Sequence, residues 1–539
     1  MAGGAGCRDR MPQCRGFHHV QGMTMRTRGL LLLAFVAAPS LAATPPTSAP
    51  TQLQGLDAYV QRVMHDWHVP GVAIVVVRDG KVLLARGYGV RELGKPGKVD
   101  ADTLFGIASN TKAFTVAALG TLVASGKLTW DTPVVDVLKD FRLSSPYVTQ
   151  NLTLRDLLTH RTGYCDPGVW YTSDPSTILH RVRYQKPDYG FRTTFCYNNI
   201  QYDAAGRFIP AITGQDWHDY VAAHLFQPLG MDRTVTTEAA LEKSTDVAVP
   251  HGMVDGKLAA IHRYWPHEAD VLPADGAIWS SANDMGHWLQ MLLADGKYDS
   301  KTVLDAKVVN AMETPQMLIR SGTGIGREIR AWMPGGTFYS YGLGLFMQEN
   351  HGHTLVWHAG DDEGMASALV MAPDAHLGIV VLSNMNQADA RFSIVAHVLQ
   401  SMLDLPRNDI EPALLADAQR YQAKDKATEK KFADTRIAGS KPPLPLADYA
   451  GNYHDELDGN AHVNVENGHL VLRLDNPDLT GDLQPWHGST FRVNWRYTFY
   501  GDDYANFDAD ALRHPAKLTL TGMWLHYERA QPANKGAQW

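Results

Sequence analysis

Apolar residues form strand-like runs near both ends of the first 405 residues and follow a helical period between those ends. The segment PGVAIVVVRDGKVLLARGYGV, from Pro70, holds two β-branched runs around Asp79-Gly80, a pattern typical of a β-hairpin. Around Leu355 the pattern returns in TLVWHAG, MASALVMAP and LGIVVLSN, which predict three strands joined by tight turns. Between these ends, stretches such as 216–225 and 283–293 have apolar positions at helical spacing.

This order of elements predicts one antiparallel sheet assembled from both ends of a domain, flanked by helices and carrying an inserted helical subdomain. We therefore expect a mixed α/β fold of the α+β kind, in which helices flank an antiparallel sheet. The domain is expected to cover residues 52–405. A charged, alanine-rich stretch at 411–436 and the following KPPLP predict a helical linker over 406–445. From Leu446, alternating runs such as HVNVENGHLVLRL and STFRVNW predict a separate small all-β domain, a barrel or sandwich, over 446–539.

The N-terminal 51 residues predict export. Residues 23–42 have a basic front with Arg26 and Arg28, the apolar run LLLLAFVAA and a small-residue end, the three parts of a secretory signal peptide. The run is too short to span a bilayer, and cleavage after Ala42 would leave a Thr/Pro linker at 43–51. Residues 1–22 fit no signal peptide and are interpreted as translation from a start codon placed too early. We therefore expect a periplasmic or secreted protein.

Composition narrows the partners. The chain has 539 residues, 45% of them hydrophobic, with a formal net charge of −8. It has no Lys/Arg-rich run, which argues against nucleic acid or an anionic membrane surface as a partner and leaves a small molecule or short peptide as substrate. If residues 1–22 are absent, Cys165 and Cys196 are the remaining cysteines. An oxidising compartment favours a disulfide, but the sequence alone leaves open whether the two thiols meet.

The segment GIASNTKAFTVAALGTLVASGKL, residues 106–128, places Ser109 three positions before Lys112 at the start of an apolar helix. Serine is a preferred helix N-cap, and a lysine one turn later is usually solvated. However, side chains at i and i+3 share one helix face, so the amine can reach the hydroxyl and take its proton. Because the surroundings are apolar, Lys112 would be partly desolvated and a credible base.

A serine nucleophile also needs a second proton carrier and an oxyanion site. Two stretches downstream of Lys112 contain candidates for these two roles. In YGFRTTFCYNN, Tyr197 could relay a proton and the Asn199 amide could orient a substrate carbonyl. At the end of a predicted strand, His358-Ala359-Gly360 places a glycine where a substrate can lie against the strand edge and its N–H groups.

These three elements, in this order, resemble the signatures Ser-x-x-Lys, Tyr-x-Asn and His-x-Gly or Lys-Thr-Gly of the serine β-lactamase and penicillin-binding protein superfamily. The resemblance is to its class C-like branch of esterases, D-aminopeptidases and DD-peptidases, and it covers about residues 56–405. The tail from Leu446 is similar to the lipocalin-like barrel often fused behind such hydrolases.

The resemblance implies a mechanism and a site. Ser109, activated by Lys112, would form an acyl-enzyme, and Tyr197 would protonate the leaving group. The backbone N–H groups of Ser109 and Asp361 would form the oxyanion hole, Asn199, His358 and Gly360 would bind substrate, and no metal or organic cofactor is implied. In the family the loop before Cys165 lies near the active site, which leads us to expect a disulfide that braces the second motif.

The resemblance leaves the substrate open. Asp361, Asp362 and Glu363 follow the third motif, and three acids at the rim of a site would repel an anionic substrate. We therefore favour an amidase, peptidase or esterase acting on a neutral or amine-bearing substrate, possibly a D-amino acid peptide. The alternatives are a β-lactamase or DD-carboxypeptidase and, from another class of function, a non-catalytic sensor of peptides or β-lactams.

Competing motifs are weaker. Ser281-Ala282-Asn283 matches a Ser-x-Asn pattern, but its flanks predict a helix that Ser281 caps. The sequence contains no Gly-x-Ser-x-Gly, the nucleophile elbow of α/β-hydrolases. His262, His267 and His287 lack the spacing of zinc ligands, so no metal site is predicted.

Overall fold

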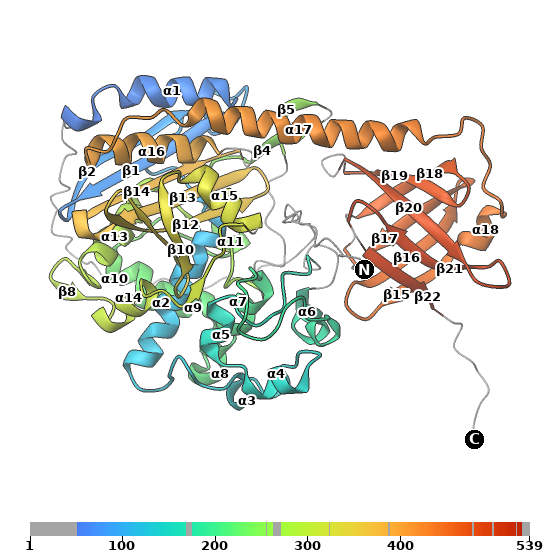
Figure 1. The fold of residues 1–539 in the computed structure, drawn as a ribbon, viewed down its shortest axis with the longest axis horizontal. Helices are drawn as coiled ribbons and strands as arrows, with labels where there is room; N and C mark the ends of the chain where they lie inside the picture. The colour runs from blue at the N-terminus through green and yellow to red at the C-terminus, as the bar shows by residue number, and fades with distance from the viewer. Residues whose placement is uncertain are drawn as a thin grey trace, which may run out of the picture.

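The computed structural model describes residues 51–530 except for 169–174, 255, 262–270, 323, 386–388, 477–478, 498–500 and 524. Figure 1 shows two bodies joined by a long helix: a sheet domain, described from residue 51 to 405, and a barrel domain, described from residue 446 to 530. The expected upstream extension at 1–22, the signal peptide at 23–42 and nearly all of the linker at 43–51 lie outside the described residues.

An eight-stranded antiparallel sheet forms the centre of the sheet domain, in the order β2-β1-β14-β13-β12-β11-β10-β9. The bounds are β1 Gly71–Arg78, β2 Lys81–Gly89, β9 Met317–Leu318, β10 Gly336–Tyr341, β11 Phe346–Asn350, β12 His353–Asp362, β13 Met365–Ala372 and β14 Leu377–Ser383. The hairpin between β1 and β2 turns at Asp79 and Gly80, both at positive φ as a two-residue turn with right-handed strand twist requires. Because β1 pairs with β14, the two ends of the domain complete one sheet, as the sequence predicts.

Helices cover both faces of this sheet. On one face α13 (Ala282–Leu293) packs against β1, β2 and β14. On the other face α16 (Ala390–Met402) packs against β13 and β14 and contacts α1 (Leu56–Asp66). Successive residues of β1 accordingly alternate between two hydrophobic clusters, with Val75 in one and Ile74 and Val76 in the other. Burial on both faces explains why β1 is an unbroken apolar run in the sequence.

The inserted helical subdomain lies between β2 and β9. Its helix at the start of the insertion is α2 (Thr111–Ala124), and the helices that follow are α3 Val134–Val137, α4 Pro146–Asn151, α5 Leu154–Leu158, α6 Pro175–Arg181, α7 Asn199–Gly206, α8 Phe208–Thr213, α9 Trp217–Val221, α10 Gln227–Leu229 and α11 Glu238–Glu242. The helix expected at 216–225 starts as α9 but widens into a π-helical turn, η5 (Ala222–Phe226), before α10. Later in the domain lie α14 (Ala306–Met312) and α15 (Gly324–Trp332).

Three short two-stranded sheets complete the sheet domain. They pair β3 (Phe105–Gly106) with β6 (Trp279–Ser280), β4 (His251–Val254) with β5 (Lys257–Ala260), and β7 (Lys297–Tyr298) with β8 (Lys301–Thr302). The first of these pairs the strand before Ser109 with residues more than 170 positions later in the chain, Phe105 with Ser280 and Gly106 with Trp279.

The linker helix α17 (Glu411–Asp434) runs from the sheet domain to the barrel domain (Figure 1). After α18 (Leu446–Tyr449), eight antiparallel strands close into a barrel: β15 Gly451–Asp455, β16 Gly459–Glu466, β17 His469–Leu474, β18 Thr480–His487, β19 Thr490–Trp495, β20 Asp502–Ala509, β21 Pro515–Leu520 and β22 Leu525–Arg529. An ion pair of 3.3 Å between Arg181 and Asp475 and the packing of Leu457 on the core of the sheet domain join the two bodies.

The predicted fold class is confirmed: a helix-flanked antiparallel sheet with a helical subdomain, followed by a small all-β barrel. Within the described parts of the chain, no helix is both long and apolar enough to cross a bilayer.

Candidate active site

Ser109 lies at the junction of a short strand and a buried helix. The 3₁₀ turn η2 (Ala108–Asn110) follows β3 and leads directly into α2. Ala108, immediately before the serine, has a φ of +46°, a left-handed conformation that costs a non-glycine residue free energy and often marks a functional site. The backbone N–H of Ile107 donates to the carbonyl of Ile278 at 2.9 Å. Because Ile278 immediately precedes β6, this hydrogen bond fixes the start of the turn beside that strand. Ser109 itself is half-buried.

Lys112 is buried beneath this serine with no exposed surface. Its Nζ donates to Ser109 Oγ at 3.0 Å, to Asn199 Oδ1 at 2.7 Å and to the Asp275 carbonyl oxygen at 3.0 Å. The same nitrogen lies 4.9 Å from the centre of the Tyr197 ring. The structure therefore brings Lys112 together with Ser109, Tyr197, Asn199 and Asp275, the last of them 163 positions later in the sequence, and it directs a buried amine at the Ser109 hydroxyl.

The second motif is held beside this amine by the start of α7. Asn198 caps the helix by accepting from the Gln201 backbone N–H at 3.0 Å. Asn199 follows as the first helical residue, and its backbone N–H donates to Asp166 Oδ2 at 2.8 Å. The Asn199 side-chain oxygen accepts from Lys112, and the expected contact of its amide with a substrate stays a prediction. The Tyr197 ring packs against the His160 ring, with centroids 4.3 Å apart.

A disulfide and backbone hydrogen bonds fasten the Tyr197 loop to the loop after α5. Cys165 and Cys196 are bonded, with their Cα atoms 5.0 Å apart, as we expected from the family resemblance. The Cys196 N–H donates to the His160 carbonyl at 2.8 Å, and the Asp166 N–H donates to the Tyr197 carbonyl at 3.0 Å. These contacts fix the backbone on both sides of Tyr197.

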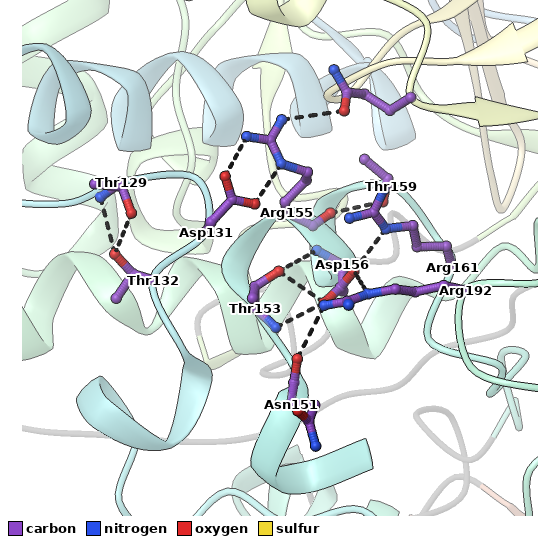
Figure 2. Close-up of polar contacts among 11 residues, drawn as sticks. Thr129, Asp131, Thr132, Asn151, Thr153, Arg155, Asp156, Thr159, Arg161 and Arg192 are labelled. Atoms are coloured by element: carbon purple, nitrogen blue, oxygen red, sulfur yellow. Dashed lines mark hydrogen bonds and ion pairs between the residues drawn. The ribbon is translucent and has the colours of Figure 1, made fainter. Parts of the chain in front are cut away.

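Behind these loops a buried carboxylate joins two arginines (Figure 2). Asp156, fully buried on α5, accepts from Arg192 at 2.6 Å and from Arg161 at 2.7 Å. It also completes a capping box with Thr153 at the start of α5. Burial alone would raise the pKa of Asp156, but hydrogen bonds from Arg192, Arg161 and Thr153 hold that pKa below its ordinary value. Arg192 lies on the Tyr197 loop, so this network anchors the second motif to α5.

The third motif brings a strand edge against the serine. A Cβ added at Gly360 on β12 would lie 2.1 Å from the Ile107 carbonyl oxygen and 3.0 Å from the Ser109 backbone nitrogen. Only glycine therefore lets β12 come this close to η2. The approach sets the Ser109 N–H beside the strand that carries Asp361, the arrangement expected of an oxyanion hole.

His358 is buried on the same strand, with 2% of its surface exposed. Its Nε2 lies 3.2 Å from the Tyr341 hydroxyl, and its Nδ1 lies 2.6 Å from the Ala359 carbonyl oxygen. Burial, together with the charge of Lys112, lowers the pKa of His358 to about 3, so the ring is neutral at pH 7. The structure thus places His358 within the packing that supports β12, where its side chain presents almost no surface to a substrate.

The three acids after Gly360 do not form the open rim that the sequence suggested. Asp361 makes two hydrogen bonds of 2.7 and 2.6 Å to Arg391, which is itself 2% exposed. Glu363 is also 2% exposed. Burial raises the pKa of Asp362 to about 6, with smaller contributions from neighbouring acids. The charge of Asp361 is therefore balanced from within, and the expected repulsion of anions by three free carboxylates is revised accordingly.

Two site residues were missed from the sequence. Asp275 places both its carbonyl and its carboxylate near Lys112, with Oδ2 3.6 Å from Nζ. Arg391, on α16, pairs with Asp361 and also donates to the Gly360 carbonyl at 2.8 Å. Neither belongs to a motif, and each meets its partner only through the tertiary fold, so no local signal was present to identify them.

The competing motifs have structural roles or lie outside the described residues. Ser281 is buried and caps α13 by accepting from the Asp284 N–H at 3.1 Å, as its flanks predicted. His262 and His267 fall in the segment 262–270, which is outside the described residues. Among the residues with described positions, no group of three or more His, Cys, Asp or Glu side chains is arranged to hold a metal ion.

Two family models match the chain. The model described as "Beta-lactamase" matches residues 56–400, and "Domain of unknown function (DUF3471)" matches residues 435–534. A similar curated protein is "Unguisins hydrolase ungD'" of Aspergillus campestris, 28% identical over 417 residues that cover 73% of this chain and 74% of that protein. Another is "Protein flp" of Staphylococcus aureus strain MW2, 27% identical over 347 residues that cover 62% of this chain and 63% of that protein.

Solved structures share the fold at lower identity. The octameric penicillin-binding protein homologue from Pyrococcus abyssi aligns with a TM-score of 0.57 and 22% identity, covering 88% of this chain and 99% of that chain. SurE aligns with a TM-score of 0.52 and 20% identity, covering 89% and 99%. Because the Beta-lactamase model spans more than half of the sequence and includes all three motifs, the chain belongs to the Beta-lactamase family.

Proposed function

We propose that this protein is a serine hydrolase that cleaves an ester, amide or peptide bond through an acyl-enzyme on Ser109. The observation that carries the proposal is the 3.0 Å contact between Ser109 Oγ and the Nζ of the fully buried Lys112. A serine hydroxyl needs an adjacent base to attack a carbonyl at neutral pH, and a desolvated amine at this distance can serve as that base. Membership in the Beta-lactamase family and similarity to a protein named as a hydrolase support the same class of reaction.

In the proposed acylation, Ser109 Oγ forms a bond to the substrate carbonyl carbon while its proton moves to Lys112 Nζ. The carbonyl electron pair moves onto oxygen, which accepts hydrogen bonds from the backbone N–H groups of Ser109 and Asp361. Preorganised donors of this kind supply a large part of the rate enhancement in acyl transfer. When the carbonyl re-forms, the bond to the leaving group breaks, Tyr197 delivers a proton to the leaving group, and Tyr197 regains a proton from Lys112.

Deacylation reverses the roles. A water molecule loses a proton to the Tyr197 and Lys112 pair and adds to the acyl carbon, after which Ser109 Oγ leaves and regains its proton. The contacts that fix this machinery are the Asn199 and Asp275 oxygens, which orient the Lys112 amine at 2.7 and 3.0 Å. Fixed orientation matters because misplacement by about 1 Å can cost on the order of 10²-fold in rate.

For the substrate we propose an ester or amide that is neutral or bears a free amine, including short peptides with D-amino acids. Asp275 puts negative charge near Lys112, and Asp361 is already paired with Arg391. We also propose that the protein acts in the periplasm or outside the cell. The Cys165–Cys196 disulfide supports that location, since such bonds persist in oxidising compartments.

The test compares Ser109→Ala with the wild type on a panel of p-nitrophenyl esters, D-amino acid amides and nitrocefin. Loss of the nucleophile should lower turnover by about 10³-fold or more while thermal unfolding stays unchanged. Ser281→Ala is the matched control, because it removes a buried helix cap and should cost about 1 kcal/mol of stability without loss of activity.

The outcomes separate the candidate functions. Near-normal turnover by folded Ser109→Ala would contradict the proposal. A stable acyl adduct on Ser109 with no release of product from any substrate would indicate a sensor instead of an enzyme. Preferred turnover of nitrocefin would favour the β-lactamase alternative over an esterase or amidase.

A further inference from the structure

Asp275 makes two kinds of contact with Lys112. Its carbonyl oxygen accepts from Nζ at 3.0 Å, and its carboxylate oxygen Oδ2 lies 3.6 Å from the same nitrogen. The Asp275 side chain is 18% exposed and Lys112 is not exposed at all. At this separation and with this little solvent between them, the attraction between the two charges is screened far less than that of a surface pair.

The position of Asp275 is fixed from both sides by the helix that carries Lys112. On one side, Thr115 Oγ1 of α2 donates to the Ala274 carbonyl at 2.6 Å. On the other side, the Ile278 N–H donates to Thr111 Oγ1, also of α2, at 3.2 Å.

The helix that carries Asn199 adds a third attachment. Asp203 on α7 accepts from the Ala274 N–H at 2.9 Å through its Oδ1 atom. The segment that carries Asp275 is therefore tied to both helices that position the Lys112 amine, so the backbone from which the Asp275 carboxylate projects is held in place.

We propose that Asp275 is a positioning residue that completes a Ser109–Lys112–Asp275 relay, in which its carboxylate stabilises the ammonium formed on Lys112 during each acyl transfer. This inference rests on the proposed function and adds a third member to the serine and lysine pair. Its logic is that of any triad in which a carboxylate orients a base and stabilises the charge that the base acquires.

In this relay the protons and charges balance without any change in the protonation of Asp275. The proton of Ser109 Oγ moves to Lys112 Nζ as the bond from Oγ to the acyl carbon forms, so a cation appears on nitrogen and an anion on the former carbonyl oxygen. The backbone donors stabilise the anion, and the Asp275 carboxylate stabilises the cation. When the leaving group departs, it takes up a proton and Lys112 returns to the neutral form, while Asp275 stays ionised throughout.

Other titratable groups face this pair. Burial raises the pKa of the Asp275 carboxyl, the charge of Lys112 opposes that rise, and Asp166 adds to it. The Asp275 charge in turn helps to raise the pKa of Asp362. The groups around Lys112 from the remaining elements are Tyr197, Tyr202, His160 and His358.

The test is Asp275→Asn, which keeps the shape of the side chain and removes its charge. We expect kcat on the best p-nitrophenyl ester to fall by about 10- to 100-fold with KM changed by less than about 3-fold, because the loss is confined to the transition state. We also expect the acidic limb of the kcat/KM profile to move down by about one pH unit, since a nearby carboxylate favours the charged form of an amine. Asp275→Glu should recover part of the rate and the acidic limb.

Two controls keep the outcome clear. Asp362→Asn removes a charge that interacts with Asp275 and should move the acidic limb by less than half of the Asp275→Asn shift. The pH dependence of Ser109 labelling by a fluorophosphonate probe gives the same comparison without a substrate, and thermal unfolding checks that Asp275→Asn folds.

A wild-type acidic limb and plateau rate in Asp275→Asn would overturn the inference, and so would equal shifts in both variants. If Asp275→Asn does not fold, Asp275→Ala decides through its acidic limb, because it also removes the charge. A limb displaced down by about one pH unit supports the relay, whereas a limb at the wild-type position contradicts it. If Ser109→Ala remains active, the proposed function itself is wrong. If Ser109→Ala is inactive but Asp275→Asn behaves as the wild type, the proposed function stands and only the role of Asp275 in the relay is excluded.

Discussion

The sheet domain and the barrel domain bury different kinds of side chain. Among the described residues of the barrel domain, Asp503 is the one charged side chain that is nearly inaccessible, and the interior is otherwise filled by rings and aliphatic groups such as Tyr453 and Phe507. The sheet domain, in its described part, buries many more charges: Lys112, Asp156, Asp203, Asp284, Glu363 and Arg391.

The two sets of strands differ in the same way. β13 and β14 are buried at every position, whereas β16 and β19 alternate between buried and more exposed positions. A buried charge costs several kcal/mol unless it is paired, so a fold keeps one where it fixes geometry or performs chemistry. Lys112 and Asp156 are buried at and behind the candidate site, and the barrel interior has no comparable cluster among its described residues. The comparison therefore supports the sheet domain as the place of the proposed chemistry.

The largest effect on turnover is expected from substitution of Lys112. We expect this buried lysine to be needed for activity and not for stability. Lys112→Met should reduce turnover of the best ester by about 10³-fold or more, because the base that accepts the Ser109 proton is lost. Replacing a buried ion by an apolar side chain of similar length is often neutral or stabilising, so the melting temperature should stay equal or rise. Exposed Lys127→Met is the control and should change neither quantity. A strongly destabilised Lys112→Met would show that this cation is needed for the fold.

In the barrel domain, loss of a core ring should affect stability and leave activity almost intact. Phe507 packs edge-to-face against Tyr449, Phe491 and Tyr453, with centroids 5.1 to 5.7 Å apart. Phe507→Ala should cost about 3 to 5 kcal/mol of unfolding free energy, measured by denaturant titration, through lost burial and the cavity left behind.

The matched variant in the sheet domain is Phe114→Ala on α2, where Phe114 stacks on Trp288 at 3.9 Å. Its stability cost should be similar, but it should also lower kcat, because α2 carries Lys112. If Phe507→Ala loses as much kcat as Phe114→Ala while still folded, the barrel contributes to the site and the comparison between the two domains fails.

How far the sequence predicted each domain follows from this contrast. Alternation in HVNVENGHLVLRL predicted the barrel strands because one face of each meets solvent, and β13 and β14 were predicted as apolar runs because both of their faces are covered. Ser109, Lys112 and Gly360 could be proposed from the sequence, because local spacing and the absence of a side chain mark them, and the structure brings them together.

Asp275 and Arg391 were not found, because the chain brings Asp275 to Lys112 across 163 positions and Arg391 to Asp361 across 30. The helix expected to end at Leu225 continues through a π turn to Leu229, because tertiary packing overrode the local period. Spacing thus indicated the candidate reacting groups, and tertiary contacts supplied the groups that contact them.

The Asp156 network should be the main acid-sensitive support of the site. Asp156→Asn should cost about 3 kcal/mol, because two buried arginine contacts lose their counter-charge. The pKa of Asp156 is lowered in the folded protein, so its stabilisation is present above the unfolded carboxyl pKa of about 4 and is lost as pH falls through the folded value.

The difference in stability between wild type and Asp156→Asn should therefore be constant above about pH 5 and shrink below about pH 4. Asp131→Asn is the control, since Asp131 pairs with Arg155 but is 64% exposed and should contribute less than about 1 kcal/mol (Figure 2). Denaturant titrations from pH 3 to 8 measure both. A difference that is constant down to pH 3 would show that packing, and not charge, accounts for the role of Asp156.

The smallest expected effect is on the preference for substrate charge. Because Arg391 pairs with Asp361 and compensates its charge, Asp362 is the acid after the third motif to test. Asp362→Asn should raise kcat/KM for nitrocefin relative to a neutral ester by about 2- to 5-fold at pH 8, the range for one partly screened charge. The pKa of Asp362 is about 6 in the folded protein, so this ratio should become equal to that of the wild type at pH 5, where the native carboxyl is protonated. Asp361→Asn should instead lower stability, because it leaves the buried Arg391 without its counter-charge. The ratio of kcat/KM for nitrocefin to that for the neutral ester could instead be the same in wild type and Asp362→Asn at both pH values. That result would exclude the charge of Asp362 as a source of selectivity, and the shape of the site would have to account for it.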